Sequence, residues 1–260
     1  MIAAAQLGLS PGDRIQYRFL RWLFPGEPRY MSGDVYKDKS KIRTLLGDRV
    51  LEELRGKAVV DFGCGNGSDS VSLAKGIASE VIGIDIREDV LALARERARR
   101  EGVAEQCCFC TSVERPVDAI VSLDAFEHFA DPAGVLARMD GLLKPRGAVY
   151  VSFGPTWYHP LGGHLFSVFP WAHLIFSETA LLRWRSHIYD DGATRFGEVA
   201  GGLNQMTISR FERIVAESPF KFEFLEAVPI RRLRALHNRL TREFTTSIVR
   251  CKLVPRNVAA

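Results

Sequence analysis

The sequence predicts an α/β protein with a Rossmann-like, doubly wound sheet of seven strands. The sheet is expected to be mostly parallel and to carry helices on both faces. Two observations lead to this fold class. Residues 57–153 alternate short β-branched runs with segments of helical periodicity, joined by short connections, and the pattern resumes after residue 206. Such alternation implies right-handed crossovers between parallel strands.

Apolar periodicity predicts each element in turn. The helix that begins at Asp131 and Pro132 has a favoured N-cap followed by a favoured first residue. Near the C-terminus, Leu233, Leu236 and Leu240 recur at helical spacing, so this face of a predicted helix should pack while its arginines face solvent. We predict strands at 58–62, 80–86, 107–111, 117–123, 147–153, 220–228 and 245–254, and helices at 67–75, 87–101, 131–143, 207–218 and 231–244.

The remaining segments suggest the domain organisation. Residues 1–55 contain helical segments broken by "FPGEP" and "MSGD", and we expect them to form a lid over the ligand pocket. Their aromatic piece "YRFLRWLF" could instead lie on a membrane surface. Residues 56–260 are expected to form one ligand-binding domain. It includes an aromatic-rich insertion at about 154–206, which is long enough to suggest a role in substrate binding.

Composition limits the function classes. Of the 260 residues, 47% are hydrophobic and 25% charged, and the formal net charge is only +4, so nucleic acid is not an expected partner. No apolar stretch reaches the roughly 18 to 20 residues of a membrane span. The N-terminus has no basic region before a long apolar run, and the five cysteines fit neither a disulfide framework nor a zinc site. A cytoplasmic protein with reduced thiols is expected.

The stretch "VVDFGCGNG" at residues 59–67 predicts a ligand site. Gly63, Gly65 and Gly67 follow a strand directly, so the backbone can turn sharply and a ligand can approach it without meeting a Cβ. Amides at the start of the next helix favour an anionic group. Asp85, about twenty residues on and at the end of the second strand, can accept hydrogen bonds from both hydroxyls of a ribose.

Two ligands fit an adenosine-like site of this kind. The dinucleotide pattern G-x-G-x-x-G would need a third glycine where this chain has Ser68. The successive stretches "VVDFGCGNG", "GIDI", "AIVSLDAFEHF" and "LLKPRGAVYVSF" resemble the motifs of class I S-adenosylmethionine-dependent methyltransferases, in particular a type 11-like, small-molecule branch. The resemblance covers roughly residues 57–153. Beyond them a late strand pair resembles the antiparallel edge of the family's sheet, which implies an antiparallel last strand. An NAD(P)-dependent oxidoreductase and a non-catalytic, regulatory protein that binds S-adenosylmethionine remain alternatives.

The resemblance implies a role for each matching residue. The glycine loop would wrap the methionine part of S-adenosylmethionine and of its product S-adenosylhomocysteine, and Asp61 would stabilise the loop or the ammonium group. Asp85 would hold the ribose, and Ile86 would pack on the adenine. Ser112 stands where many members have an acid that bonds the adenine amino group. The cofactor-binding residues implied are Asp61, Gly63, Cys64, Gly65, Asn66, Gly67, Asp85, Ile86, Thr111, Ser112, Val113, Leu123 and Asp124.

The acceptor is less constrained than the cofactor. A D/N-P-P-Y/F-type motif is absent after the fourth strand, which argues against methylation of amino groups in nucleic-acid bases or protein glutamine. We expect a small, hydrophobic or aromatic acceptor, methylated on oxygen, nitrogen or carbon, against an aromatic wall built by the insertion. His128, His159 and His164 are the candidate catalytic bases. No metal is expected, and the oligomeric state is left open.

Overall fold

The computed structural model describes residues 8–26, 41–189, 191–199 and 201–256. Seven strands form one sheet in the order β3-β2-β1-β4-β5-β7-β6, and β7 runs antiparallel to both of its neighbours. The predicted fold class is therefore confirmed. The strands are β1 (Ala58–Phe62), β2 (Glu80–Ile84), β3 (Cys107–Cys110), β4 (Val117–Leu123), β5 (Leu143–Phe153), β6 (Phe220–Pro229) and β7 (Thr246–Pro255).

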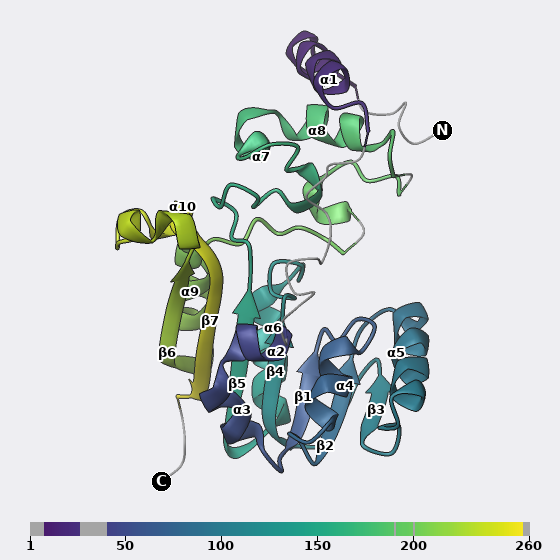
Figure 1. The fold of residues 1–260 in the computed structure, drawn as a ribbon, viewed down its shortest axis with the longest axis vertical. Helices are drawn as coiled ribbons and strands as arrows, with labels where there is room; N and C mark the ends of the chain where they lie inside the picture. The colour runs from purple at the N-terminus through teal and green to yellow at the C-terminus, as the bar shows by residue number, and fades with distance from the viewer. Residues whose placement is uncertain (1–7, 27–40, 190, 200, 257–260) are drawn as a thin grey trace.

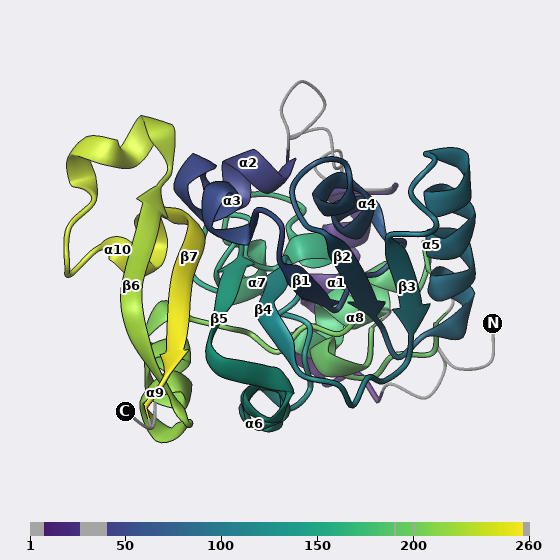
Figure 2. The same ribbon diagram turned by 90° about the horizontal axis from the view of Figure 1, so that it is seen from below.

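The helices cover both faces of this sheet. Figure 2 shows α2, α3 and α4 on one face, and α6 and α9 on the other. The insertion between β5 and α9 contributes short helices that stand beyond the sheet (Figure 1). The α-helices are α1 (Pro11–Leu23), α2 (Lys41–Leu46), α3 (Asp48–Leu54), α4 (Ser68–Ala74), α5 (Glu88–Arg100), α6 (Pro132–Leu142), α7 (Ala172–Ile175), α8 (Glu178–Arg185), α9 (Ile208–Glu217) and α10 (Arg242–Thr245); the 3₁₀ turns are η3 (His164–Phe166), η4 (Phe196–Glu198) and η5 (Arg231–Leu236).

The strand register brings the expected ligand-binding segments to one edge. Asp61 of β1 lies opposite Gly83 of β2 and Val121 of β4, so these three parallel strands end side by side. The strand order reverses at β1, and ligands of open α/β sheets bind outside the carboxyl ends of the strands at such a point. The glycine loop, Asp85 and Asp124 all follow these strand ends directly.

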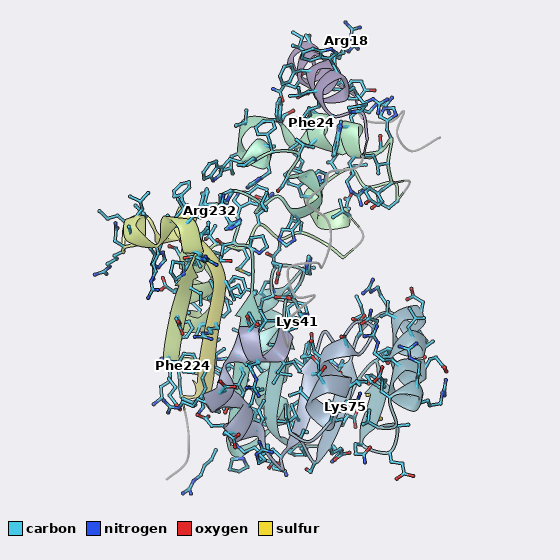
Figure 3. All side chains as sticks on the ribbon, viewed as in Figure 1. Arg18, Phe24, Lys41, Lys75, Phe224 and Arg232 are labelled. Atoms are coloured by element: carbon cyan, nitrogen blue, oxygen red, sulfur yellow. The ribbon has the colours of Figure 1, made fainter. Side chains whose placement is uncertain are left out.

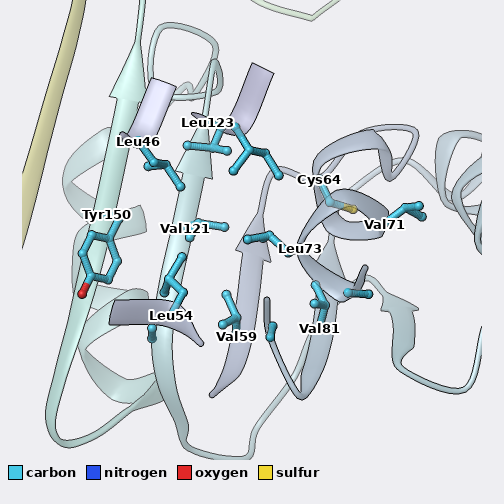
Figure 4. Close-up of a cluster of buried hydrophobic side chains, with 14 of the residues drawn as sticks. Leu46, Leu54, Val59, Cys64, Val71, Leu73, Val81, Val121, Leu123 and Tyr150 are labelled. Atoms are coloured by element: carbon cyan, nitrogen blue, oxygen red, sulfur yellow. The ribbon is translucent and has the colours of Figure 1, made fainter. Parts of the chain in front are cut away.

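Each face of the sheet has its own buried core. On one face, Leu46 and Leu54 of α2 and α3 pack with Val59 and Val121 of the sheet (Figure 4). On the other face, Phe126, Phe153 and Phe211 lie within 6.5 Å of one another, ring centre to ring centre, beneath α6 and α9. Burial on both faces explains why the central strands are almost continuously apolar.

A third core joins α1 to the insertion rather than to the sheet. Leu20 of α1 is fully buried with Phe166 and Trp184 of the insertion, and the Trp184 indole donates to the Phe24 carbonyl at 2.8 Å. Residues 1–55 are therefore split between two parts of the molecule, because α2 and α3 pack on the sheet. The "MSGD" break lies outside the described residues, and a lid role for the N-terminal segment stays a prediction.

The continuous helix expected at 231–244 is wrong. The chain forms η5, then a turn, and then the single turn of α10. Asn238 causes the break, because its Oδ1 accepts hydrogen bonds from the backbone N–H groups of Leu240 and Thr241 and so replaces helical bonding. The expected packing of the leucine face is also wrong, since Leu236 and Leu240 are exposed. Within the described residues, no helix is both long and apolar enough to cross a membrane.

Candidate functional site

The loop between β1 and α4 consists largely of left-handed backbone. Gly63, Gly65 and Gly67 have φ values of 85°, 51° and 73°, which residues with a Cβ adopt at a cost. A Cβ on Gly63 would lie 2.9 Å from the Ala125 methyl, and one on Gly67 would lie 2.7 Å from the Ala94 methyl. At Gly65, by contrast, no atom of the described chain lies within 4 Å of the Cβ position. The loop is therefore open to a ligand at Gly65.

The loop is anchored to the end of the neighbouring strand. The backbone N–H groups of Gly63 and Cys64 both donate to the Ile84 carbonyl, at 2.8 and 2.9 Å. The Cys64 side chain points into the core (Figure 4), and burial raises the pKa of its thiol. Cys64 can therefore offer a ligand its backbone but not a thiolate, whereas Asn66 is exposed at the loop tip.

Asp85 links this loop to the end of β2. Its Oδ2 accepts from the Gly65 N–H at 3.0 Å, and its Oδ1 accepts from the Arg87 backbone N–H at 3.0 Å and from Arg87 Nε at 3.4 Å. A carboxylate offers about four acceptor positions. The long contact to the half-exposed Arg87 side chain can yield to a better donor. The carboxylate thus has room for incoming hydroxyl groups while it still holds the glycine loop.

The residues expected around an adenine lie beside Asp85. Ile86 is 88% exposed, an unusual position for a large aliphatic side chain. Thr111 and Ser112 are exposed at the end of β3, and Val113 is half-buried. Leu123, in contrast, is buried in the sheet core. Ile86 therefore presents an apolar surface next to the carboxylate.

Asp61 is buried at the end of β1 and is bonded within the protein. Its Oδ2 accepts from the Ser70 hydroxyl of α4 at 2.6 Å. Burial, together with the neighbouring Asp69 carboxylate, raises the pKa of Asp61 to about 7. This bond fastens α4 to β1, so Asp61 supports the loop from beneath.

Lys41 was missed by sequence reasoning and lies beside the same strand ends. Its Nζ lies 2.7 Å from Asp69 Oδ2 and 3.2 Å from Asp124 Oδ2. Burial alone would lower the pKa of Lys41, but the two carboxylates hold it raised. Figure 3 shows Lys41 at the start of α2, above the ends of the central strands. A cation is thus fixed between two acids close to the glycine loop.

The loop after β4 places Asp124 and Glu127 at the same edge. Asp124 has a φ of 49°, and its backbone N–H donates to the Ser152 carbonyl at 2.8 Å. Glu127 is buried, and its Oε1 accepts from the Gly154 N–H at 3.2 Å. Its Oε2 has no hydrogen-bond partner among the described residues. Burial, reinforced by Asp124, raises the pKa of Glu127 to about 8, so this carboxyl is largely protonated at neutral pH.

The structure brings together two of the three predicted histidines. The rings of His128 and His164 meet edge to face with centres 5.4 Å apart. His128 Nδ1 lies 2.8 Å from the Gly202 carbonyl, which makes that nitrogen the donor. His164 Nε2 is buried without a partner in the described part of the chain. Burial, with His128 nearby, lowers the pKa of His164 to about 4, so its ring is neutral.

His159 occupies a different environment. Its Nδ1 accepts from the Leu161 N–H at 2.9 Å, which holds its own turn in place. Burial lowers the pKa of His159 to about 4, with His173 as the second cause. His173 in turn lies 2.6 Å, measured from its Nε2, from the Trp157 carbonyl. His159 therefore has a structural task that His164 Nε2 lacks.

Asn204 connects the end of the insertion to the β4 loop and was also missed. Its Nδ2 donates to the carbonyls of Phe126 and Phe129, at 2.7 and 2.8 Å, and its backbone N–H donates to the Glu127 carbonyl at 2.9 Å. No short motif marks such a residue, because its partners lie about 75 residues away. Across the described residues, no group of three or more His, Cys, Asp or Glu side chains is arranged to hold a metal ion.

Comparison with known proteins decides the family. Residues 53–155 match the family described as "Methyltransferase domain". These residues form a class I S-adenosylmethionine-dependent methyltransferase domain. The match covers the glycine loop, Asp85, the β4 loop and β5, whereas Lys41, His164 and Asn204 lie outside the matched residues.

The names of the proteins related to this methyltransferase domain indicate different methyl acceptors. A ubiquinone biosynthesis O-methyltransferase of Neisseria meningitidis is 36% identical over 107 residues, which cover 38% of this chain and 45% of the relative. A ribosomal protein L11 methyltransferase of Vibrio parahaemolyticus is 37% identical over 101 residues, covering 38% and 34%. The chain thus spans less than half the length of the curated relatives it matches.

Solved structures share the fold of most of the chain at low identity. A S-adenosylmethionine-dependent methyltransferase from Mesorhizobium loti has a TM-score of 0.52 at 18% identity, over 79% of this chain and 94% of that one. The [4+2]-cyclase SpnF has a TM-score of 0.55 at 12% identity, over 95% and 97%. These similarities concern the fold alone.

The site residues of the methyltransferase domain fit S-adenosylmethionine, the cofactor of this family. The open backbone at Gly65 can accept a ligand, and Asp85 retains acceptor capacity next to an exposed apolar Ile86. Lys41 supplies a positive charge near the glycine loop, where the amino-acid part of the cofactor would lie. Both the charged and the apolar requirements of the cofactor are thus met by residues of this chain.

Proposed function

We propose that this chain transfers a methyl group from S-adenosylmethionine to an oxygen or nitrogen atom of a small, hydrophobic acceptor. The arrangement of Gly65, Asp85 and Lys41 at the carboxyl ends of adjacent parallel strands carries the proposal, because it offers an open backbone, a ribose acceptor and a cation together. When bound, the cofactor supplies a methyl group already activated by the positive charge of its sulfur.

In this proposal the cofactor is held by four elements of the chain. Asp85 accepts hydrogen bonds from the ribose hydroxyls, and Ile86 covers the adenine. The backbone from Gly63 to Gly67 follows the amino-acid part, and Lys41 faces its carboxylate. Asp61 acts from beneath through Ser70, because its own carboxyl is buried. Thr111, Ser112 and Val113 stay candidates for the far side of the adenine.

The acceptor group is proposed to lie beside Glu127 and His164. Glu127 is held by the Gly154 N–H, and the His164 ring is held against the His128 ring. Each retains one buried polar atom without a partner in the described residues. A protonated carboxyl can donate a hydrogen bond, and a neutral imidazole can accept one. A hydroxyl or amino group, which both donates and accepts, complements this pair.

His164 is the proposed base for the transferred proton. Its ring is neutral and its Nε2 has no partner among the described residues, so the tautomer protonated at Nδ1 offers Nε2 as an acceptor. His128 orients that ring by its edge-to-face contact. The main contribution of the protein is otherwise to align the acceptor with the methyl group, an effect of proximity and orientation.

The preference for a small, hydrophobic acceptor rests on the insertion. Many of its aromatic side chains, including Phe166, Trp184 and Phe196, are used in the core that it shares with α1. The acceptor wall expected from composition is therefore smaller than the aromatic count suggests. We further propose a cytoplasmic location, because all five cysteines are free thiols, and we do not expect nucleic acid as a partner.

The first test is calorimetric titration with S-adenosylhomocysteine. We expect micromolar affinity for the wild type, and a loss for Asp85→Ala of roughly tenfold to hundredfold for each hydrogen bond removed from a charged acceptor. Arg87→Ala is the matched control, since it removes only the long contact at 3.4 Å and should leave affinity nearly unchanged. Absence of binding by the folded wild type would overturn the proposal, and NAD(P) would then be titrated.

Turnover needs a separate measurement, because a fold shared with a cyclase does not establish methyl transfer. Release of S-adenosylhomocysteine from S-adenosylmethionine would be followed across phenols, quinols and aliphatic amines. Binding of the cofactor without turnover on any acceptor would favour the non-catalytic alternative.

A further inference from the structure

The exposed apolar side chains of this chain gather at one end of the molecule. Among the described residues, twelve large hydrophobic side chains are exposed, and ten of them lie on three segments; only Ile86 and Leu93 lie elsewhere. Monomeric proteins rarely expose apolar side chains in one contiguous patch without a function for it. The ten are Ile15, Phe19, Trp22 and Leu23 of α1, Trp171, Leu174 and Ile175 at α7, and Leu236, Leu240 and Phe244 between β6 and β7.

These three segments are neighbours in space although they are far apart in the sequence. Phe19 of α1 lies 6.1 Å, between ring centres, from Phe176, the residue that follows α7. The Trp171 indole donates to the Tyr158 carbonyl at 2.9 Å, and the Tyr158 ring lies 5.2 Å from Phe244. Figure 1 shows α1 and α7 beyond the carboxyl ends of the parallel strands, and α10 to one side of them, over the ends of β6 and β7.

Helix α1 has three faces: one packs on the insertion, one is apolar and exposed, and one carries arginines. Tyr17, Leu20 and Phe24 recur at spacings of three and four, and they pack on the insertion. Ile15, Phe19 and Trp22 also recur at four and three, and Trp22 is 76% exposed. Arg14, Arg18 and Arg21 form the remaining stripe. Figure 3 shows Arg18 at the outer side of α1. The exposed half of the helix is therefore amphipathic in its own right.

Positive charge is concentrated on the same segments. Helix α1 and residues 230–244 together contain eight arginines and two acids, a net charge of +6, whereas the whole chain has +4. Both acids have inward partners: Asp13 bonds Ser177, and Glu243 accepts from two backbone N–H groups at the start of α9. We call the ten apolar residues and these arginines the apolar–basic surface. The arginines are Arg14, Arg18, Arg21, Arg231, Arg232, Arg234, Arg239 and Arg242, of which Arg242 is already paired with Glu212 at 2.6 and 2.8 Å.

This combination suits a lipid surface better than a nucleic acid. Aliphatic side chains such as Leu240, which is 91% exposed, gain little against phosphates or base edges. In the interface of a bilayer, the same side chains enter the acyl boundary, indoles sit at the headgroup level, and arginines meet anionic headgroups. Apolar area and charge complementarity then act together.

We propose that the apolar–basic surface docks this protein on a membrane that contains anionic phospholipids. The docked face is built by α1, the insertion and the β6–β7 connection, and it lies at the end of the sheet where the strands carry the site residues. A hydrophobic acceptor dissolved in the bilayer would reach the site from this side. Such access of the acceptor rests on the proposed function, whereas docking on the membrane does not.

Vesicle flotation tests the docking. We expect the protein to float with vesicles of phosphatidylcholine mixed equally with phosphatidylglycerol, and to stay behind with phosphatidylcholine alone. Binding should weaken when salt rises from about 0.01 M to about 1 M, because the Debye length falls from about 30 to about 3 Å. Arg18→Gln and Arg232→Gln should each weaken partition about fivefold. Trp22→Ser should weaken it at either salt concentration.

The other face of the protein supplies matched controls. Arg100→Gln and Leu93→Ser remove an exposed arginine and an exposed leucine from α5, and they should leave flotation unchanged. Circular dichroism and S-adenosylhomocysteine titration of every variant would show that folding and cofactor binding persist, which separates this proposal from the function of the site. No flotation of the folded wild type with anionic vesicles would overturn the docking. A dimer abolished by Trp22→Ser, without flotation, would overturn it in favour of self-association.

Discussion

Replacing Lys41 by Met tests the cluster of charges beside the glycine loop. The ammonium lies 2.7 Å from Asp69 and 3.2 Å from Asp124, and the three side chains are 30, 13 and 25% exposed. Hydrogen bonds to charged groups contribute about 1.5–3 kcal/mol when they are buried, and exposed ion pairs about 0.2–1 kcal/mol. Partial burial places the loss in the free energy of unfolding at about 1.5–2.5 kcal/mol.

The size of this effect depends on the acids that Lys41 leaves behind. Without the ammonium, Asp124 stays half-buried and uncompensated, and burial already raises its pKa. Lys41→Met in an Asp124→Asn background should therefore cost at least about 1 kcal/mol less than in the wild type, as a double-mutant cycle measures. Because the pKa of Lys41 is raised above its usual 10.5, its stabilising effect is fully present below that pH, and urea unfolding at pH 7.5 captures it.

An exposed ion pair of the same kind provides the control. Lys75 lies 2.6 Å from Glu101, but these side chains are 48 and 37% exposed, so Lys75→Met should cost less than about 1 kcal/mol. Equal costs for the two lysines, or additive effects of Lys41→Met and Asp124→Asn, would refute the reasoning. Lys41→Met should also weaken S-adenosylhomocysteine binding, whereas Lys75→Met should not.

Three further predictions concern the neighbouring groups. The pKa of Glu127 is raised from 4.5 to about 8, so the protonated carboxyl stabilises the fold below pH 4.5 and this contribution is lost as the pH rises to 8. Glu127→Gln should therefore flatten the decline of the unfolding free energy with pH in urea unfolding, and an unchanged pH profile would contradict this prediction. Gly65→Ala should lower the free energy of unfolding by about 1–2 kcal/mol, because alanine is strained in the left-handed region, and it should weaken S-adenosylhomocysteine binding. The new methyl group of Gly67→Ala would also lie 2.7 Å from Ala94, so this variant should be destabilised further in thermal unfolding. His164→Ala should lower the turnover rate about 10²–10⁴-fold with cofactor affinity unchanged. His159→Ala should leave the turnover rate within about tenfold, and a larger loss for His159→Ala than for His164→Ala would assign the base to His159.

The sheet and the proximity of the glycine loop to Asp85 were readable from the sequence because their signals are local. Each strand of residues 57–153 is a short apolar run bounded by turn residues, and the observed bounds differ from the predicted ones by a few residues. The glycine loop and Asp85 follow consecutive strands, and parallel strands end at one edge of a sheet. Chain order alone therefore placed Gly65 near Asp85, which the 3.0 Å hydrogen bond now describes.

The helix prediction for residues 231–244 was wrong because apolar periodicity does not show whether a side chain competes for the backbone hydrogen bonds of a helix. Leu233, Leu236 and Leu240 have helical spacing, but the Asn238 side chain bonds the backbone ahead of it and ends the helix. Apolar spacing identifies which residues share a face and not whether that face is covered. The exposed stripe of α1 shows the same limit, since its two apolar stripes look alike in sequence and only one of them packs on the insertion.

By itself, the sequence determined the fold class, the glycine loop and the carboxylate that faces it, because these follow from neighbours along the chain. Only the tertiary structure decided that Lys41 meets Asp124, that Asn204 holds the β4 loop, and that His164 rather than His159 keeps an unpartnered nitrogen beside His128. The physical reason is distance along the chain. These groups are far apart in the sequence, and only folding determines which charged and hydrogen-bonding groups lie close enough to interact.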